Sequence, residues 1–439
     1  MTSPILHRAM WRWHFYAGLY VIPFLMMLAA TGLIILWFTA IAPEYGDRLN
    51  LTAGDKTLTI TEQTNAVQKA YPEAKIGKYI APLSPQNPAL FQLDAQSGSR
   101  MLALNPYTGE ILRDVPKDGT WNEFATDIHG TLLVGDIGDR LIEAAAGLGI
   151  LMVITGLFLW WPQKAFLPDF AAKGRAFWKS LHSAGGFWMS LVLVFFFISG
   201  LAWAGIWGGK MVQAWSTFPA EKWDNVPLSD ATHASMNHGA EKQVPWALEQ
   251  TLMPESKGLP DGTPVVLETV VALGRAIGFE GRFQVAAPAD EKGVWTLSQD
   301  SMSYDSPDPT ADRTVHVDQY TGQILASVGF ADYSLPGKAM AVGIALHEGQ
   351  MGWWNIALNA LLCLGIFMLG ATSVVMWWLR RPAGRVGVPL YPQSFRLPVI
   401  LGIAALLLSA AFPVTGVAIL AFALIDFLLP KRWKEAGAA

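Results

Sequence analysis

The sequence predicts a mainly α-helical membrane protein. We expect a pseudo-two-fold bundle of four core transmembrane helices plus a C-terminal transmembrane hairpin, with two small α+β modules outside the membrane. Hydrophobic residues make up 52% of the chain and charged residues only 15%, whereas a soluble domain carries about 25% charged residues. Several apolar runs are long enough to cross a bilayer. The first half of the chain also resembles the second, which predicts a repeated architecture.

Four apolar runs are expected to span the membrane, because about 20 mostly apolar residues cross the hydrocarbon layer. A fifth apolar region, at 397–429, is interrupted by Pro413 and is long for one span but short for two. We expect a tight helical hairpin that turns near Pro413, and a single span is the alternative. The four full spans are expected at residues 15–41, 141–161, 187–207 and 356–379.

Basic residues set the expected orientation, because short loops rich in Lys and Arg stay in the cytoplasm. They occur before the first span, between the second and third, after the fourth and near the C-terminus. We therefore expect a multi-pass protein of the bacterial inner membrane, with a cytoplasmic N-terminus and with segments 42–140 and 208–355 in the periplasm. The basic residues are Arg8, Arg12, Lys164, Lys173, Arg175, Lys179, Arg380, Arg381, Arg385, Lys431, Arg432 and Lys434.

Charge, cysteine content and the N-terminal sequence exclude several classes of protein. A net charge of −4 provides no basic field for nucleic acid. The single cysteine, Cys363, lies in an apolar run. It excludes an intrachain disulfide, a four-cysteine iron–sulfur cluster and C-x-x-C-H haem attachment. The first apolar run is too long for a cleaved signal peptide, so we expect a retained span.

An internal repeat relates two halves of the chain, about 1–165 and 176–385. Outside the spans, "LNPYTGEIL" at 104–112 recurs as "VDQYTGQIL" at 317–325, and each half ends in a Trp pair. Each half is therefore expected to contain a span, an external module, a histidine and a second span. When His14 is placed on His182, the matched glycines are Gly18 with Gly186 and Gly32 with Gly200.

The external modules are expected to be small α+β units, each with a short amphipathic helix, alternating strands and a "YTG" turn. A polar loop at 231–245 is inserted before the second module. The expected parts are the N-terminal tail and first span at 1–41, the first module at 42–126, a histidine segment and second span at 127–162, a cytoplasmic loop at 163–181, the third span at 182–207, the second module with its inserted loop at 208–345, a histidine segment and fourth span at 346–380, a cytoplasmic loop at 381–396, and the C-terminal hairpin and tail at 397–439.

Four of the eight histidines occupy repeat-related positions at the ends of spans. His14 and His182 lie at the expected cytoplasmic starts of the first and third spans, and His129 and His347 lie on the external side before the second and fourth. Two pairs at matching depth could ligate two metal centres, one near each face. Two neutral imidazoles suit the axial positions of a b-type haem. The alternative is that each histidine is an ordinary interfacial polar residue.

Small and cationic residues near these histidines fit the same interpretation. The glycines of the repeat could face a flat cofactor, although they could equally permit close helix packing. Arg12 and Lys179 on the cytoplasmic side, and Arg140 on the external side, are candidate partners of haem propionates.

The remaining polar residues in unusual places carry weaker predictions. His233 and His238, with Met236 between them, could contact a metal, although such a loop is more often solvated. His316 alternates within an expected strand and is interpreted as structural. Glu143 and Asp426 lie within or near spans, where each is either a proton relay or a satisfied structural acid.

Several stretches resemble the PepSY-associated transmembrane family. The resemblance covers about residues 6–430 and includes all four spans in order. "NPYTGEIL" and "DQYTGQIL" resemble the ends of its PepSY modules. The span stretches are "WRWHFYAGLYVIPFLMMLAATG", "IHGTLLVGDIGDRLIE", "LHSAGGFWMSLVLVFFFISGLAWAGIWG" and "LHEGQMGWWNIALN".

The resemblance implies an inner-membrane reductase of ferric siderophores that contains two b-type haems. It places the family's haem histidines on His14, His129, His182 and His347. Some relatives are fused to flavodoxin and NADPH-binding domains. Here no Gly-rich dinucleotide fingerprint follows a strand. We therefore expect the electron donor to be a separate cytoplasmic flavoprotein or a membrane quinol.

The expected electron path runs from a haem between His14 and His182 to a haem between His129 and His347. The electrons would then reach a ferric chelate or siderophore held by the external modules. An alternative is a non-enzymatic PepSY membrane protein that binds or regulates a periplasmic partner, or assists metal uptake. A transporter built from repeats is the weaker alternative, because such repeats usually meet at discontinuous helices. Membrane lipid is the other expected partner, and nucleic acid is not expected.

Overall fold

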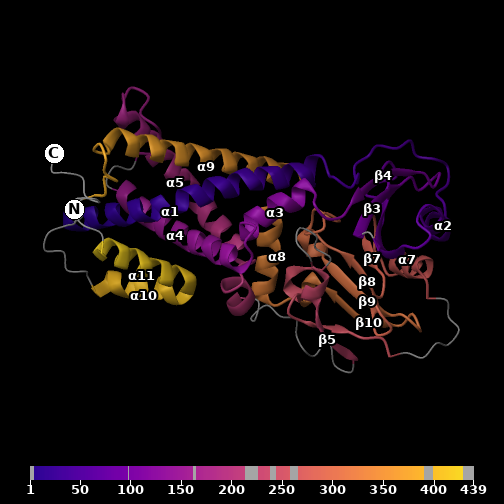
Figure 1. The fold of residues 1–439 in the computed structure, drawn as a ribbon. Helices are drawn as coiled ribbons and strands as arrows, with labels where there is room; N and C mark the ends of the chain where they lie inside the picture. Colours follow the sequence, from indigo (N-terminus) through magenta and orange to yellow (C-terminus); the bar gives the residue numbers. More distant parts are fainter. Residues whose placement is uncertain are drawn as a thin grey trace. The chain divides into compact units, whose positions relative to one another are not determined.

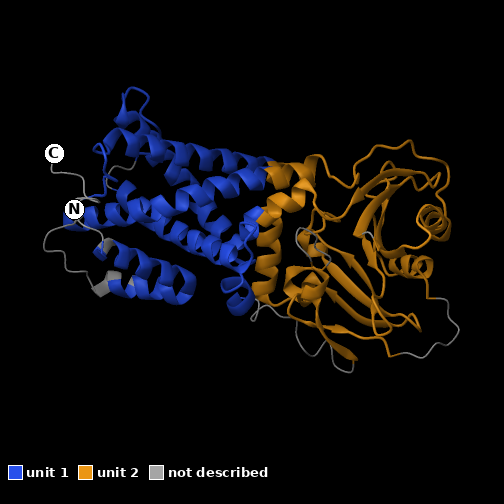
Figure 2. Ribbon diagram, viewed as in Figure 1, with its two compact units in different colours: residues 1–33, 128–212, 357–439 blue, residues 34–127, 213–356 orange. Residues whose placement is uncertain are grey.

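The apolar runs of the sequence form four long helices in the computed structural model, which describes residues 4–96, 98–161, 165–212, 226–237, 244–257, 265–389 and 399–428. The chain divides into two units, coloured separately in Figure 2. Unit 1 contains residues 1–33, 128–212 and 357–439, and unit 2 contains residues 34–127 and 213–356. Each unit is therefore assembled from segments that are distant in the sequence.

Within the described residues, four helices are long and apolar enough to cross a membrane. They lie side by side along most of their length (Figure 1). Each overlaps one of the expected spans and begins before it, because helix ends tolerate charged side chains that reach the interface. α4 ends one residue before the expected end at 161, and α5 ends at Leu201, six residues before the expected end at 207. These helices are α1 (Pro4–Leu36, continued by one π-helical turn at Trp37–Ile41), α4 (Asp136–Trp160), α5 (Arg175–Leu201) and α9 (Trp353–Arg380).

Small residues bring the helices of unit 1 into close contact. A Cβ added at Gly149 of α4 would lie 2.4 Å from the Phe197 ring of α5, so only glycine permits this approach. Van der Waals packing of this kind is the main force between helices in lipid. The buried cluster at the centre of the unit includes Ala29, Ile150, Val153, Leu193, Phe197, Leu362 and Ile366.

The C-terminal apolar region forms two helices, α10 (Val399–Ala411) and α11 (Pro413–Leu428), that lie side by side (Figure 1). Pro413 occupies the first position of α11, where its missing N–H costs no hydrogen bond. The two helices contain 13 and 16 residues, fewer than the roughly 20 that cross a bilayer. The break therefore falls at the proline that the sequence singled out.

Acidic residues at the start of α4 hold the chain that follows α5. Asp139 accepts a hydrogen bond from the backbone N–H of Gly205 at 3.0 Å, and Glu143 accepts one from Trp207 at 3.1 Å. The Arg140 guanidinium lies 2.6 Å from Asp139 and 3.3 Å from Glu143. Glu143 therefore makes the contacts of a structural acid whose hydrogen bonds are satisfied. The Asp426 side chain lies outside the described residues.

Unit 2 is built on one eight-stranded sheet of described residues, with strand order β10-β9-β8-β7-β1-β2-β3-β4. The segments expected to form two modules contribute four strands each and join where β1 pairs antiparallel with β7. The strands are β1 (Lys75–Ile80), β2 (Ala89–Ala95), β3 (Gly98–Leu104), β4 (Ile111–Pro116), β7 (Gln284–Ala286), β8 (Val294–Gln299), β9 (Arg313–Asp318) and β10 (Ile324–Gly329), with β5 (Leu228–Thr232) and β6 (Leu252–Pro254) in a separate pair.

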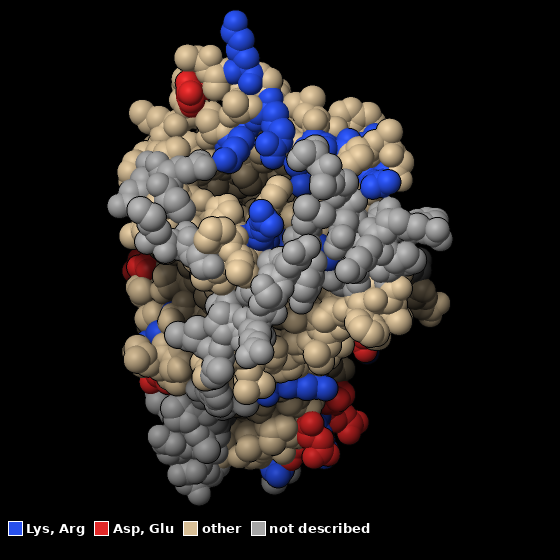
Figure 3. Space-filling model, turned by 90° about the vertical axis from the view of Figure 1, so that its left-hand side faces the viewer, with Lys and Arg blue, Asp and Glu red and all other residues tan. Residues whose placement is uncertain are grey.

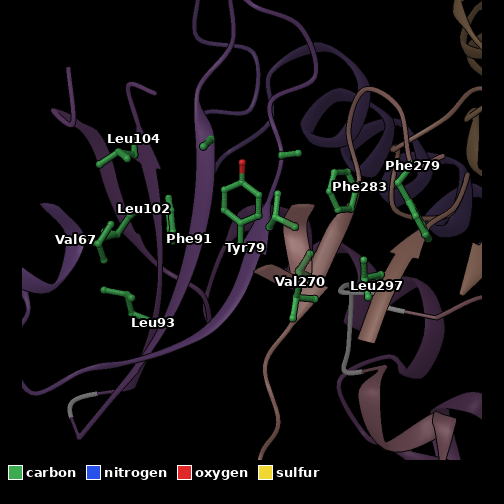
Figure 4. Close-up of a cluster of buried hydrophobic side chains, with 14 of the residues drawn as sticks. Val67, Tyr79, Phe91, Leu93, Leu102, Leu104, Val270, Phe279, Phe283 and Leu297 are labelled. Carbon is green, nitrogen blue, oxygen red and sulfur yellow. The ribbon is translucent and has the colours of Figure 1, made fainter. Parts of the chain in front are cut away.

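Two helices cover one face of this sheet. They are α2 (Ile60–Ala70), which starts with a Thr59–Glu62 capping box, and α7 (Leu267–Ala276). Figure 4 shows Val67 and Val270 from these helices in the hydrophobic core, together with strand residues from both halves of the sheet. The unit also contains α3 (Trp121–Thr131) up to residue 127 and α8 (Leu335–Glu348).

On the opposite face, strands β8 and β9 carry side chains that are polar and yet buried, whereas β1, β2 and β3 carry a second hydrophobic cluster there. Because side chains alternate along a strand, Thr296, Thr314 and His316 all project away from the hydrophobic core, and each is at most 2% exposed. Nearby, Arg282 pairs with Asp305 at 3.0 Å and with Asp47 at 2.7 Å. Removal from water raises the pKa of the carboxyls of Asp300, Asp305 and Asp312 to about 7.

His233 and His316 meet on this polar face. Their Nε2 atoms are 2.9 Å apart, the Nδ1 of His233 donates to the Thr251 carbonyl at 2.7 Å, and the Nδ1 of His316 is 3.0 Å from Thr296 Oγ1. His316 is thus held within the sheet, as a structural residue would be. The prediction that the loop around His233 is solvated is wrong at that position, because the His233 side chain is 0% exposed. His238 lies outside the described residues.

Replacing Asp312 by Asn is expected to raise the apparent melting temperature at about pH 8 and to raise it clearly less at about pH 5. The carboxyl pKa rises from 3.8 to about 7 on folding, so the folded state binds more protons in this range and loses stability as the pH rises. Asn keeps the oxygen that accepts the Ser301 N–H. The melting temperatures are measured by thermal unfolding of the full chain in detergent, with the exposed Asp55→Asn variant as the control. An equal effect at both pH values would contradict it.

Glu143→Ala is expected to lower the melting temperature, because it leaves the N–H groups of Ile206 and Trp207 without their carboxylate. Such a loss costs about 1–3 kcal/mol. Glu143→Gln keeps one acceptor oxygen and is expected to cost less. Thermal unfolding followed by helical circular dichroism ranks the two variants. A proton relay would instead leave the stability of both unchanged, which is the result that contradicts the structural role.

Candidate functional site

His14 of α1 and His182 of α5 lie next to each other in unit 1. Their ring centroids are 6.4 Å apart, and their planes are inclined at 78°. Each residue sits in an apolar helix with a glycine four residues later, at Gly18 and Gly186. The structure thus brings together the two histidines that the repeat relates and that the topology places at the same depth.

The hydrogen bonds of His14 define which ring nitrogen is free. Its Nδ1 lies 3.0 Å from the Met152 carbonyl oxygen and 3.1 Å from Thr155 Oγ1, both on α4. A carbonyl oxygen only accepts, and the Thr155 hydroxyl donates its own proton to the Leu151 carbonyl at 2.9 Å. Nδ1 therefore carries the proton, and Nε2 carries the lone pair.

His182 has the corresponding arrangement on α9. Its Nδ1 lies 3.1 Å from Thr372 Oγ1 and 3.2 Å from Ser373 Oγ. Both hydroxyls donate to the Leu369 carbonyl, at 3.0 Å and 2.7 Å. Both oxygens are thus left as acceptors for the Nδ1–H, and the lone pair of His182 is again on Nε2.

The two rings are close enough to contact the same ligand. Their centroids are 6.4 Å apart, and a metal lies about 2.0 Å from an imidazole nitrogen, so one metal could reach both rings. No group of three or more His, Cys, Asp or Glu side chains in the described ranges could hold a metal.

His129, near the end of α3, shows the same pattern at a second place in unit 1. Its Nδ1 lies 2.8 Å from Thr31 Oγ1 on α1, and the ring also has a hydrogen bond to the Leu28 backbone. Thr31 donates its proton to the Met27 carbonyl at 2.9 Å. His347 is the last residue but one of α8 and belongs to unit 2.

The three predicted cations have different surroundings. Arg12 is 4% exposed, and its guanidinium donates to the Pro389 carbonyl and, at 3.3 Å, to Tyr16 Oη. Lys179 is exposed on α5. Arg140 already has two carboxylate partners. Sequence reasoning used Arg380 of α9 only for orientation and gave it no role at the site, although its guanidinium stacks on Trp11 of α1 at 4.8 Å.

Basic side chains gather at the end of unit 1 where the helix bearing His14 begins. Figure 3 looks onto this end and shows Lys and Arg grouped on it. This charge is what the positive-inside rule associates with a cytoplasmic face. Among the described residues of unit 1, the exposed cations near the ends of α1, α5 and α9 are Arg8, Lys173, Arg175, Lys179 and Arg385.

Sequence reasoning also missed the hydroxyls that hold the histidines. The signal was present in the repeat, because matching the Trp pair at Trp160 to the pair at Trp377 places Thr155 on Thr372. A threonine within an apolar span gives no signal by composition. Only the contact with Nδ1 distinguishes it from a helix-packing residue.

A comparison with known protein families finds a match that covers the spans. The sequence pattern of the family described as PepSY-associated TM region matches residues 11–380, which covers the helices of the site and most of the chain. No curated protein matches the chain. This membrane protein therefore belongs to the PepSY-associated TM family.

Proposed function

We propose that this chain is an inner-membrane b-type di-haem oxidoreductase. It passes electrons from the cytoplasmic or membrane side to a periplasmic acceptor, a ferric siderophore or other ferric chelate. The observation that carries the proposal is the pair His14 and His182, whose centroids are 6.4 Å apart and whose Nδ1 atoms are both engaged by the protein. This leaves two Nε2 lone pairs for one metal.

A b-type haem matches the donor set. It needs two axial ligands and no thioether, and the described residues offer a pair of imidazoles rather than a larger metal-binding group. When bound, the haem supplies reversible one-electron exchange between ferric and ferrous iron. The protein's part is to present two neutral imidazoles and to keep the site apolar, with Gly156 close to the His14 ring.

A second haem is assigned to His129 and His347. His129 is held by Thr31 and the Leu28 carbonyl in the same way as His14 is held on α4. A protein that carries electrons across about 30 Å of hydrocarbon needs a centre near each face. The four helices long enough to cross the membrane provide the scaffold for both.

The donor and the acceptor are assigned by charge and by redox chemistry. The basic end of unit 1 suits an acidic flavoprotein as donor, because opposite charges steer encounter, and a membrane quinol is the other donor considered. Unit 2 would hold the ferric chelate. Reduction releases the iron, because hard oxygen donors bind Fe²⁺ less tightly than Fe³⁺.

The first test is the absorption spectrum of the detergent-purified protein, oxidised and dithionite-reduced, with haem counted per chain. About two b haems per chain are expected, with sharp α and Soret bands on reduction. His14→Ala and His182→Ala are expected to lose the same haem, and His129→Ala and His347→Ala the other. His7→Ala, on the same helix as His14, is the matched control and should lose neither.

The reduced protein is then mixed with ferric chelates, and its reoxidation is followed at the α band. Rapid reoxidation by a siderophore complex, and not by the same siderophore loaded with gallium, supports the assigned acceptor. A wild-type protein without haem, after expression with adequate haem supply, overturns the proposal. In that case the external unit becomes the functional part, as a module that binds a partner.

A further inference from the structure

We infer that Thr155, Thr372 and Ser373 are positioning residues that set the tautomer and the donor strength of His14 and His182, and that Thr31 does so for His129. The inference rests on the proposed function, because it concerns the ligands of the proposed haems. It goes further by assigning a redox-tuning role to hydroxyls that are otherwise ordinary helix residues.

The same local construction occurs three times in unit 1. In each case the histidine Nδ1 meets a threonine hydroxyl, and the ring also meets the backbone carbonyl three residues before that threonine: Thr155 with Met152, Thr372 with Leu369, and Thr31 with Leu28. The three threonines are 1%, 1% and 5% exposed. Three occurrences at separate histidines are hard to ascribe to chance packing.

Ser199 of α5 extends the pattern through the repeat. The alignment of His14 on His182 also places Thr31 on Ser199. The Ser199 hydroxyl donates to the Phe195 carbonyl at 2.9 Å, as the Thr31 hydroxyl donates to Met27 at 2.9 Å. Ser199 is 3% exposed. Ser199 is therefore the residue of the second half that corresponds to Thr31, and its variant is tested beside the Thr31 variant.

The physical effect follows from the direction of each hydrogen bond. A hydroxyl that gives its proton to a carbonyl is polarised, and its oxygen becomes a better acceptor. An imidazole whose N–H donates to such an acceptor is a more basic ligand at its other nitrogen, as outer-shell partners of metal-bound histidines show. A more basic ligand favours ferric iron. Removing the hydroxyl should therefore raise the midpoint potential of that haem.

The two ligands of the first haem are not equivalent. In the repeat, Ser373 corresponds to Gly156, so His182 has two hydroxyls at Nδ1 while His14 has one. A Cβ at Gly156 would lie 3.1 Å from Cε1 of His14, so the ring occupies the space of the missing side chain. His182 is therefore expected to be the stronger donor of the pair.

The test uses full-length variants that remove a hydroxyl with little change of shape: Thr155→Val, Thr372→Val, Ser373→Ala, Thr31→Val and Ser199→Ala. Ser190→Ala is the control. Its hydroxyl donates to the Gly186 carbonyl on the same helix as His182, and it is 8% exposed. Thr155→Ser restores a hydroxyl and serves as the rescue variant. Haem content, spectroelectrochemical midpoint potentials and low-spin EPR signals are recorded for each.

The expected result is a full complement of haem with an upward shift in the potential of one haem. The Thr155, Thr372 and Ser373 variants should shift one centre, and the Thr31 and Ser199 variants the other. Ser190→Ala and Thr155→Ser should match the wild type. Potentials that stay at the wild-type values in Thr155→Val and Thr372→Val, with both haems bound, overturn the inference.

A measurement without haem separates this inference from the proposed function. In ¹⁵N-histidine-labelled apoprotein, solid-state NMR should show His14 and His182 neutral with the proton on Nδ1, with each signal assigned by its His→Ala variant. Protons on Nε2 overturn the inference whether or not the wild type binds haem. If the wild type binds no haem but shows the Nδ1–H tautomer, only the proposed function is overturned.

Discussion

The proton on Nδ1 is the constraint on which the site depends. An imidazole inside an apolar helix bundle loses its water, and each polar atom left unpaired costs about 1–3 kcal/mol. The helices α4 and α9 satisfy Nδ1 of His14 and His182 with hydroxyl and carbonyl oxygens. Among the described residues, Nε2 of neither ring makes a hydrogen bond. Each ring is therefore left with one nitrogen that, under the proposed function, binds the haem iron.

The helices that carry the hydroxyls are not the helices that carry the first histidine pair, so the site exists only when the helices of unit 1 are packed. α1 and α5 provide the rings, and α4 and α9 provide the oxygens. Close packing at Gly149 against Phe197 brings α4 and α5 together. Loss of helix packing would thus separate each histidine from the group that orients it.

The spans, their order and the proximity of His14 and His182 could be predicted because they depend on local signals, namely apolar length and a repeated motif. The single sheet could not, because the pairing of β1 with β7 joins residues about 200 positions apart, as at Tyr79 and Val285. Alternation within one strand says nothing about its neighbour. The burial of His233 was missed for the same reason, since its partner His316 is distant in the chain.

The rigidity of these contacts bears on how such a site would act. Hydrogen bonds to groups that are fixed in helices hold each ring in place before a metal binds. The free energy of metal binding then does not include the cost of ordering these side chains. The same fixed dipoles change little when a bound iron changes charge, and a centre that reorganises little exchanges electrons readily. Buried hydroxyls such as Thr155 suit this task better than carboxylates, because they tune the ring without adding a second charge to the membrane interior.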